Sequence, residues 1–280
     1  MNPETGNTSP NRWLVLARVV LFLLSCAVVL AATAPLSAGL RGNWQELSIG
    51  TIASFGAFAL TLLFVRWEKI RMEDVGAAVG RRSLARLTLG FFVGLLLVSV
   101  WASTVRAAGQ VRWIHATGID VRAATVAFAG YLALACREEL AFHGYPLRRL
   151  ERLFGLWAAQ IFVALVFAAE HKLGGSNWLD ALLGPAVGSL LFGMAAIATR
   201  GLALPIGLHA AWNFGQWSLG MKAQPGLLKF VVREGSEQRI HWIGVMTYVP
   251  VMLLATFAFW LWHRRAQGES YAQPHDYSDV

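Results

Sequence analysis

The chain has 280 residues, of which 56% are hydrophobic and only 14% are charged. This composition excludes an ordinary soluble domain of this size. The formal net charge is +8, but the basic residues stand in the connections between apolar runs rather than in one patch. That placement is typical of a membrane protein, and we expect no nucleic-acid partner.

Apolar runs near the length that crosses a hydrocarbon core of roughly 30 Å recur along the chain. In lipid each backbone amide and carbonyl must be paired within its own segment or in a closed barrel, so we expect helices. The eight runs are about 13–34, 48–65, 85–105, 121–151, 156–172, 179–199, 202–219 and 242–262. The sequence therefore predicts an all-α, polytopic membrane helix bundle with about eight transmembrane helices.

The domain organisation predicted from these runs is simple. A polar N-terminal tail (1–12) precedes a single membrane domain (13–265) with a catalytic core at about 121–217, and a polar C-terminal tail (266–280) follows. The first apolar run is longer than the core of a signal peptide, and Pro35 stands where cleavage would occur. We therefore expect a retained membrane anchor.

Basic residues predict the orientation in the membrane. They flank the first run, the second connection, the fourth connection and the last run: Arg12, Arg18, Arg66, Lys69, Arg71, Arg81, Arg82, Arg86, Arg148, Arg149, Arg152, Arg264 and Arg265. The positive-inside rule then places both termini in the cytoplasm of a multi-pass cell-membrane protein. Basic residues in the third and seventh connections disagree with this orientation: Arg106, Arg112, Arg122, Lys222, Lys229, Arg233 and Arg239.

Three short motifs place polar side chains within the apolar runs. They read "EELAFH" at 138–143, "FAAEH" at 167–171 and "HAAWN" at 209–213. Residues four apart share one face of a helix, which pairs the first and last residues of the second and third motifs, and Glu139 with His143. Ionisable groups inside a bilayer are costly and mark function by default.

The spacing of the motifs allows them to meet. If 121–151 is one helix and the chain reverses near Gly155, Glu138 and His171 lie at the same depth, roughly 20–25 Å from the turn. His209 lies roughly 10–15 Å from Gly201, where its own helix begins at the same end. We therefore expect an acid and two imidazoles from three helices to gather around one buried site.

The ordered set of motifs resembles the intramembrane CAAX prenyl proteases and bacteriocin-processing or immunity enzymes, called the CPBP or Abi family. Members carry Glu-Glu-x-x-x-Arg, Phe-x-x-x-His and His-x-x-x-Asn/Asp motifs in this order on separate membrane helices. The resemblance covers about 121–217, where "LALPIGLHAAWNF" is close to the context of the third motif. The departure is His143, which stands where the family has arginine.

The resemblance implies a glutamate-type endopeptidase that hydrolyses a peptide bond of a membrane-associated protein or peptide, without a cofactor or metal. Glu138 would be the general base, His171 would position the water, and His209 with Asn213 would stabilise the oxyanion. Glu139 would support the site, paired with His143 in place of the family's arginine, and Phe167 belongs to the second motif. Because pairing with an imidazole depends on its protonation, activity should fall more steeply at alkaline pH than in relatives with arginine.

The residues leave other functions open. Two histidines and a carboxylate with an open position also resemble a zinc site, although no HExxH motif occurs. Acids and histidines in spans can form the relay of a transporter or proton channel. A catalytically inactive relative could act by binding, for example in bacteriocin immunity, and a thiol mechanism at Cys136 is a remote alternative. Each motif could also be structural: a solvated helix end, a loop edge or an interhelical hydrogen bond.

Overall fold

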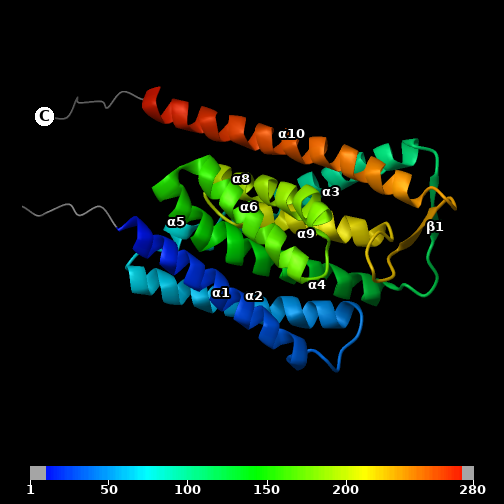
Figure 1. Cartoon of the computed structure of the whole chain (residues 1–280), viewed down its shortest axis with the longest axis horizontal. Coiled ribbons are helices and arrows are strands. Elements are labelled where there is room, and N and C mark those ends of the chain that lie inside the picture. The colour runs from blue at the N-terminus through cyan, green and yellow to red at the C-terminus, as the bar shows by residue number, and fades with distance from the viewer. Residues whose placement is uncertain (1–10, 273–280) are drawn as a thin grey trace, which may run out of the picture.

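The structure is a computed structural model that describes residues 11–272. Its helices cross the molecule eight times (Figure 1). They are α1 (Arg12–Leu36), α2 (Asn43–Glu68), α3 (Ser83–Ala107), α4 (Val121–Glu138) continued by α5 (Tyr145–Phe154), α6 (Leu156–Leu173), α7 (Trp178–Ala181) continued by α8 (Val187–Thr199), α9 (Ala203–Ser218) and α10 (Glu237–Ala272). The predicted helical fold class with eight passes is confirmed.

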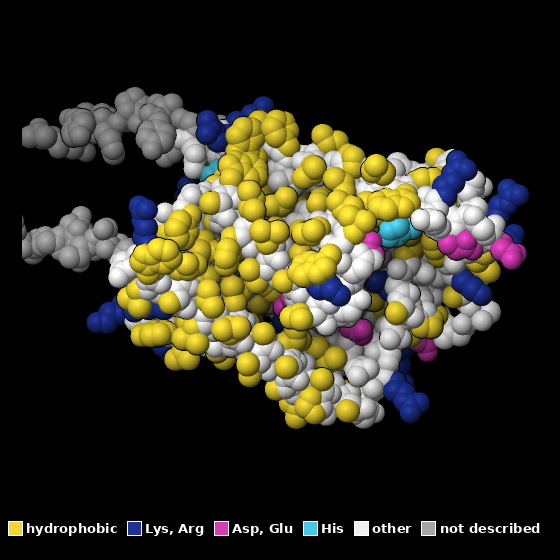
Figure 2. Space-filling view, viewed as in Figure 1, with side chains coloured by type: hydrophobic (Ala, Val, Ile, Leu, Met, Phe, Trp, Pro, Cys, Tyr) yellow, Lys and Arg dark blue, Asp and Glu magenta, His cyan; other side chains and the backbone are white. Residues whose placement is uncertain are grey.

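Six passes are long and apolar enough to span a membrane: α1, α2, α3, α6, the α7–α8 pair and α10. The remaining two, α4 and α9, carry the first and third polar motifs. They pack against each other, with α2 on α4 and α3 on α9. Hydrophobic side chains cover most of the face seen in Figure 2, whereas Lys and Arg gather toward its ends. The outer helices thus shield the polar residues of α4 and α9 from lipid.

The ends of the described chain differ slightly from the predicted boundaries. α10 continues as a helix to Ala272, into the segment that was expected to be a polar tail. Residues 1–10 and 273–280, the rest of the two predicted tails, lie outside the described residues. The first and last described residues lie at the same end of the bundle (Figure 1), as an even number of passes requires.

A two-stranded ribbon closes the opposite end of the bundle, where only helices were expected. β1 (Val111–His115) pairs antiparallel with β2 (Leu228–Val232). The Trp113 ring lies 5.4 Å from that of Phe230, and its Nε1 donates to the carbonyl of Leu219. Each strand is only five residues long and lies in a connection between spans. The search for apolar runs long enough to cross a membrane therefore did not predict these strands.

The predicted long helix of residues 121–151 is present, but a turn of π-helix (Glu139–Gly144) interrupts it between α4 and α5. Pro146 lies in the first turn of α5. A proline has no amide hydrogen and its ring collides with the carbonyl four residues earlier, so regular α-helix cannot pass through this point. The wider turn absorbs the proline, and such π turns are frequent at functional sites. The chain then reverses at Gly155, as predicted.

Glycines bring α3 and α9 into backbone contact. A Cβ atom on Gly90 would lie 2.1 Å from the carbonyl oxygen of Leu204, and one on Gly207 would lie 2.0 Å from that of Leu87. Small residues that allow such close approach are the usual means of helix packing in membranes. Since His209 follows Gly207 by two residues, this contact fixes the depth of the third motif.

Substitution of Gly207 by alanine should destabilise the protein. The new methyl group meets backbone rather than a movable side chain, so α3 and α9 must separate, at a cost of about 1–3 kcal/mol. We expect a lower midpoint of thermal unfolding in detergent. Gly244→Ala in α10 is the matched control, because a Cβ there meets only the Trp101 ring at an ordinary 3.8 Å. Equal midpoints for the two variants would contradict this account of the α3–α9 contact.

Candidate active site

The two adjacent acids end α4 and begin the π turn. Glu138 is 9% exposed and Glu139 is fully buried. Successive residues of a helix point about 100° apart, so the two carboxylates have different partners. The structure therefore excludes the solvated helix end that was the structural alternative for this pair.

Glu139 is shared by two histidines. Its Oε2 lies 2.8 Å from Nδ1 of His143, and its Oε1 lies 2.9 Å from Nδ1 of His209. The contact with His143 was expected from the helical spacing. The contact with His209 was not, because the sequence suggested Asn213 as the partner of that ring. This one carboxylate joins the first motif to the third.

The second nitrogen of His143 also has a partner. Its Nε2 lies 2.9 Å from the hydroxyl oxygen of Ser189 in α8, and the ring is fully buried. A serine hydroxyl can donate to Nε2 while Nδ1–H donates to Glu139, so a neutral imidazole satisfies both contacts. The Glu139–His143 contact, in which His143 stands where the family has arginine, therefore does not require a charged ring. The prediction that activity falls more steeply at alkaline pH assumed a charged His143, and this geometry does not need that charge.

His209 lies between the two acids. Its Nε2 is 3.4 Å from Oε2 of Glu138, and its Nδ1 contacts Glu139. Because a carboxylate only accepts hydrogen bonds, Nδ1 carries the hydrogen that bonds Glu139. The ring is stacked on Phe192 of α8 with centroids 4.2 Å apart, which holds its plane. Nε2 of His209 thus faces the carboxylate of Glu138.

Arg137 is a functional candidate that the sequence prediction did not select. Its guanidinium donates to Oε1 of Glu138 and to Oε1 of Glu170 in α6, and its side chain is only 8% exposed. Arginine can bind two carboxylates at once through its forked donors. It contacts only one carboxylate oxygen of Glu138, since Oε2 faces His209, and it ties α4 to the turn of α6 that carries His171. From the sequence alone, Arg137 resembles an ordinary ion-pair partner of an acid at a helix end. No sequence pattern indicates that its side chain is buried.

The second motif supplies a ring with one free nitrogen. Nδ1 of His171 lies 3.0 Å from the carbonyl oxygen of Phe167, so it carries a hydrogen, and among the described residues no hydrogen-bond partner holds Nε2. The Phe167 ring is buried and lies 4.5 Å from that of His171 and 6.4 Å from that of His209. Phe167 therefore packs near both histidines of the site.

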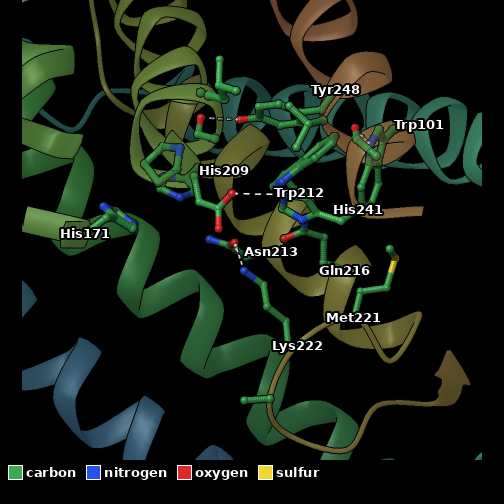
Figure 3. A pocket seen from close by; sticks show the side chains of 18 of the residues that line it. Trp101, His171, His209, Trp212, Asn213, Gln216, Met221, Lys222, His241 and Tyr248 are labelled. Atoms are coloured by element: carbon green, nitrogen blue, oxygen red, sulfur yellow. Dashed lines mark hydrogen bonds and ion pairs between the residues drawn. The ribbon is translucent and has the colours of Figure 1, made fainter. Parts of the chain in front are cut away.

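The last residue of the third motif is held from outside the motif. Oδ1 of Asn213 accepts a hydrogen bond of 2.9 Å from Nζ of Lys222, and the two side chains point at each other in Figure 3. An ammonium has only donors, so the contacted atom is the carbonyl oxygen and the Nδ2 amide group points away from Lys222. The sequence marked Lys222 only as a basic residue of a connection.

These groups line one cavity of about 700 Å³, within the range of small-molecule and peptide sites. Its polar lining includes Glu138, His171, His209, Asn213 and Lys222, and its apolar lining includes Tyr131, Phe167, Phe192, Trp212 and Tyr248. Figure 3 shows His171, His209, Asn213 and Lys222 around the same space. The three motifs therefore converge, as expected.

The cavity extends to the ribbon end of the bundle. Glu46 at the start of α2 and Phe230 and Val232 of β2 belong to its lining, and these elements lie at the end opposite the first and last described residues (Figure 1). The basic residues predict cytoplasmic termini. With that orientation, the ribbon end of the cavity would lie toward the other side of the membrane.

Two alternatives have little support in this geometry. Within residues 11–272, no group of three or more His, Cys, Asp or Glu side chains is arranged to hold a metal ion. Cys136 packs against the apolar core and does not belong to the cavity lining. A further buried acid, Glu68, lies outside the cavity lining. It contacts Arg149 at 2.7 Å and the hydroxyl of Tyr145 at 2.8 Å, and so joins α2 to α5.

The comparison with known families agrees with the motifs. Residues 120–215 match the family model described as type II CAAX prenyl endopeptidase Rce1-like. Residues 120–215 form an Rce1-like domain. This domain covers about a third of the chain and includes all three motifs, whereas Lys222 lies beyond its end. No curated protein matches the chain.

The neutral pairing of His143 in the Rce1-like domain can be tested with glutamine. His143→Gln offers a donor to Glu139 that never titrates, so the alkaline limb of the activity–pH profile should coincide with that of the wild type. Peptide cleavage in isolated membranes between pH 6 and 10 measures this. A wild-type limb that falls at lower pH than that of the variant would show that the imidazolium of His143 is the working form.

Proposed function

We propose that the protein is an intramembrane glutamic endopeptidase that hydrolyses a peptide bond of a membrane-associated protein or peptide. The family of the Rce1-like domain consists of such proteases. The observation that carries the proposal is the placement of Glu138 beside His209 in a shielded cavity, with His171 and Asn213 on the same lining.

The first step is attack by water. Oε2 of Glu138 takes a proton from the water, whose oxygen forms a bond to the carbonyl carbon of the peptide. Arg137 holds the other carboxylate oxygen and keeps the acid ionised and oriented. The free Nε2 of His171 accepts a hydrogen bond from the same water and so aligns it.

The second step is stabilisation and collapse of the tetrahedral intermediate. The electron pair of the carbonyl moves onto its oxygen, which receives hydrogen bonds from Nε2–H of His209 and from Nδ2 of Asn213. Glu139 supports this role because it binds Nδ1–H of His209. The carbon–nitrogen bond then breaks, and the proton held by Glu138 passes to the leaving amine.

The cavity lining suits a peptide with large apolar side chains, because aromatic rings face the catalytic groups. The basic residues near the first and last described residues favour cytoplasmic termini. A substrate that is itself in the bilayer could then enter between helices at the level of the cavity.

Loss of the base or of the oxyanion donor should abolish cleavage. In cells that express the wild type, Glu138→Gln or His209→Ala, quantitative membrane proteomics should find the same uncut proteins accumulating in both variants. We expect cleavage to slow about 100- to 10,000-fold for Glu138→Gln, the usual contribution of general acid–base catalysis. An immunity-type binding protein would keep its phenotype in Glu138→Gln. Proton flux without cleavage in proteoliposomes, lost in the same variant, would identify a channel or transporter instead.

Cleavage should also continue in the presence of strong chelators. The proposed steps use only side chains of the chain itself, so EDTA or 1,10-phenanthroline at millimolar concentration should leave the cleavage rate within about twofold of the untreated membranes. Loss of activity that returns on addition of Zn²⁺ would favour a metalloprotease, in which the histidines and a glutamate bind the metal.

A further inference from the structure

Lys222 brings a positive charge to the cavity from outside the Rce1-like domain. It lies in the connection between α9 and β2, lines the cavity, and its Nζ is 2.9 Å from Oδ1 of Asn213. The motif-based description assigns it no role. Its partner, however, is one of the two proposed oxyanion donors.

The backbone of the connection fixes the position of Lys222. Gly220 has a positive φ of 70°, and a Cβ there would lie 2.2 Å from the carbonyl oxygen of Leu228. A Cβ on Gly226 would lie 1.7 Å from the carbonyl oxygen of Trp217. The connection therefore folds tightly onto the end of α9 and onto β2. The backbone that carries Lys222 is therefore constrained where the side chain reaches toward Asn213.

The contact determines which way the Asn213 amide faces. Because Nζ can only donate, it selects the carbonyl oxygen and leaves Nδ2 on the other side of the planar amide. A cation on the carbonyl oxygen also polarises the amide, so its N–H groups become stronger donors. An asparagine without such a partner could rotate its amide by half a turn and present an acceptor to the oxyanion.

We propose that Lys222 is a positioning residue for peptide hydrolysis: it holds the carbonyl oxygen of Asn213 so that Nδ2 donates to the developing oxyanion, and its charge strengthens that donor. This inference rests on the proposed function. Lys222 is one of the basic residues of the seventh connection that disagree with the orientation predicted from charge. Its contact with Asn213 gives a chemical reason for a lysine at this position.

The charges that face Lys222 are acidic and come from two helices, Glu138 in α4 and Glu46 in α2. Burial lowers the pKa of the Lys222 ammonium below its ordinary value, and these two acids oppose that effect. The ammonium therefore loses its proton at a lower pH than a free lysine. Activity should fall on the alkaline side as this charge is lost.

The test compares Lys222→Met, Lys222→Arg, Asn213→Ala and the double variant Lys222→Met/Asn213→Ala. Isolated membranes are incubated, and the rate at which new protein N-termini appear is measured by mass spectrometry, counting only termini that Glu138→Gln abolishes. Lys229→Met, at an exposed position of β2, is the matched control for loss of a lysine.

We expect Lys222→Met to slow cleavage about 10- to 100-fold, the scale of a misplaced catalytic group. Lys222→Arg should retain most of the rate and move the alkaline limb to higher pH, since arginine stays charged. In the Asn213→Ala background Lys222→Met should cause no further loss, because the two residues act as one unit. The Lys229→Met rate should equal that of the wild type.

A rate for Lys222→Met within twofold of the wild type, or losses that multiply in the double variant, would overturn the inference while leaving the proposed function intact. If Lys222→Met does not fold, the alkaline limb of Lys222→Arg decides: an unchanged limb overturns the inference, and a shifted limb supports it. If the wild type forms no termini that depend on Glu138, the proposed function itself fails, and the role of Lys222 fails with it.

Discussion

The buried carboxylate of Glu139 is the interaction on which the site depends. It binds His143 within its own helix and His209 from a helix seventy residues later, with no exposure to solvent. A buried charge that loses a partner is strongly destabilising, so both histidines must stay in place for the fold to persist. The same constraint that stabilises the bundle also sets the direction of the His209 ring. Stability and the geometry for chemistry are therefore coupled through one side chain.

The surrounding helices make this arrangement possible by excluding both water and lipid. Backbone contact at Gly90 and Gly207 fixes α9 against α3, and the hydroxyl of Ser54 in α2 donates to the carbonyl of Ala133 in α4. Six passes are long and apolar enough to span a membrane, and the other two, α4 and α9, pack against each other with α2 and α3 on their outer sides. In a medium of low dielectric constant, each hydrogen bond in the cluster is stronger than it would be in water. The shielding therefore contributes directly to the orientation of the acids.

The sequence predicted the parts of the molecule that periodicity and length control. Apolar runs predicted the eight passes, Gly155 predicted the reversal, and helical spacing predicted the Glu139–His143 contact. Contacts between helices left no such signal: Arg137, Ser189 and Lys222 looked like ordinary residues of a helix end, an apolar run and a connection. Their importance depends on which helices become neighbours. The ribbon was not predicted for a related reason: its two strands have only five residues each and are far apart in the sequence, so only their pairing in the structure identifies them.

The extent of the cavity has a practical consequence. Its lining reaches Phe230 and Val232 of the ribbon, whereas the first and last described residues lie at the other end of the bundle (Figure 1). In a bundle that spans a bilayer, a hydrocarbon core of roughly 30 Å lies between these two ends. A reporter or affinity label attached beyond either described end would therefore stand well away from the ribbon side of the cavity.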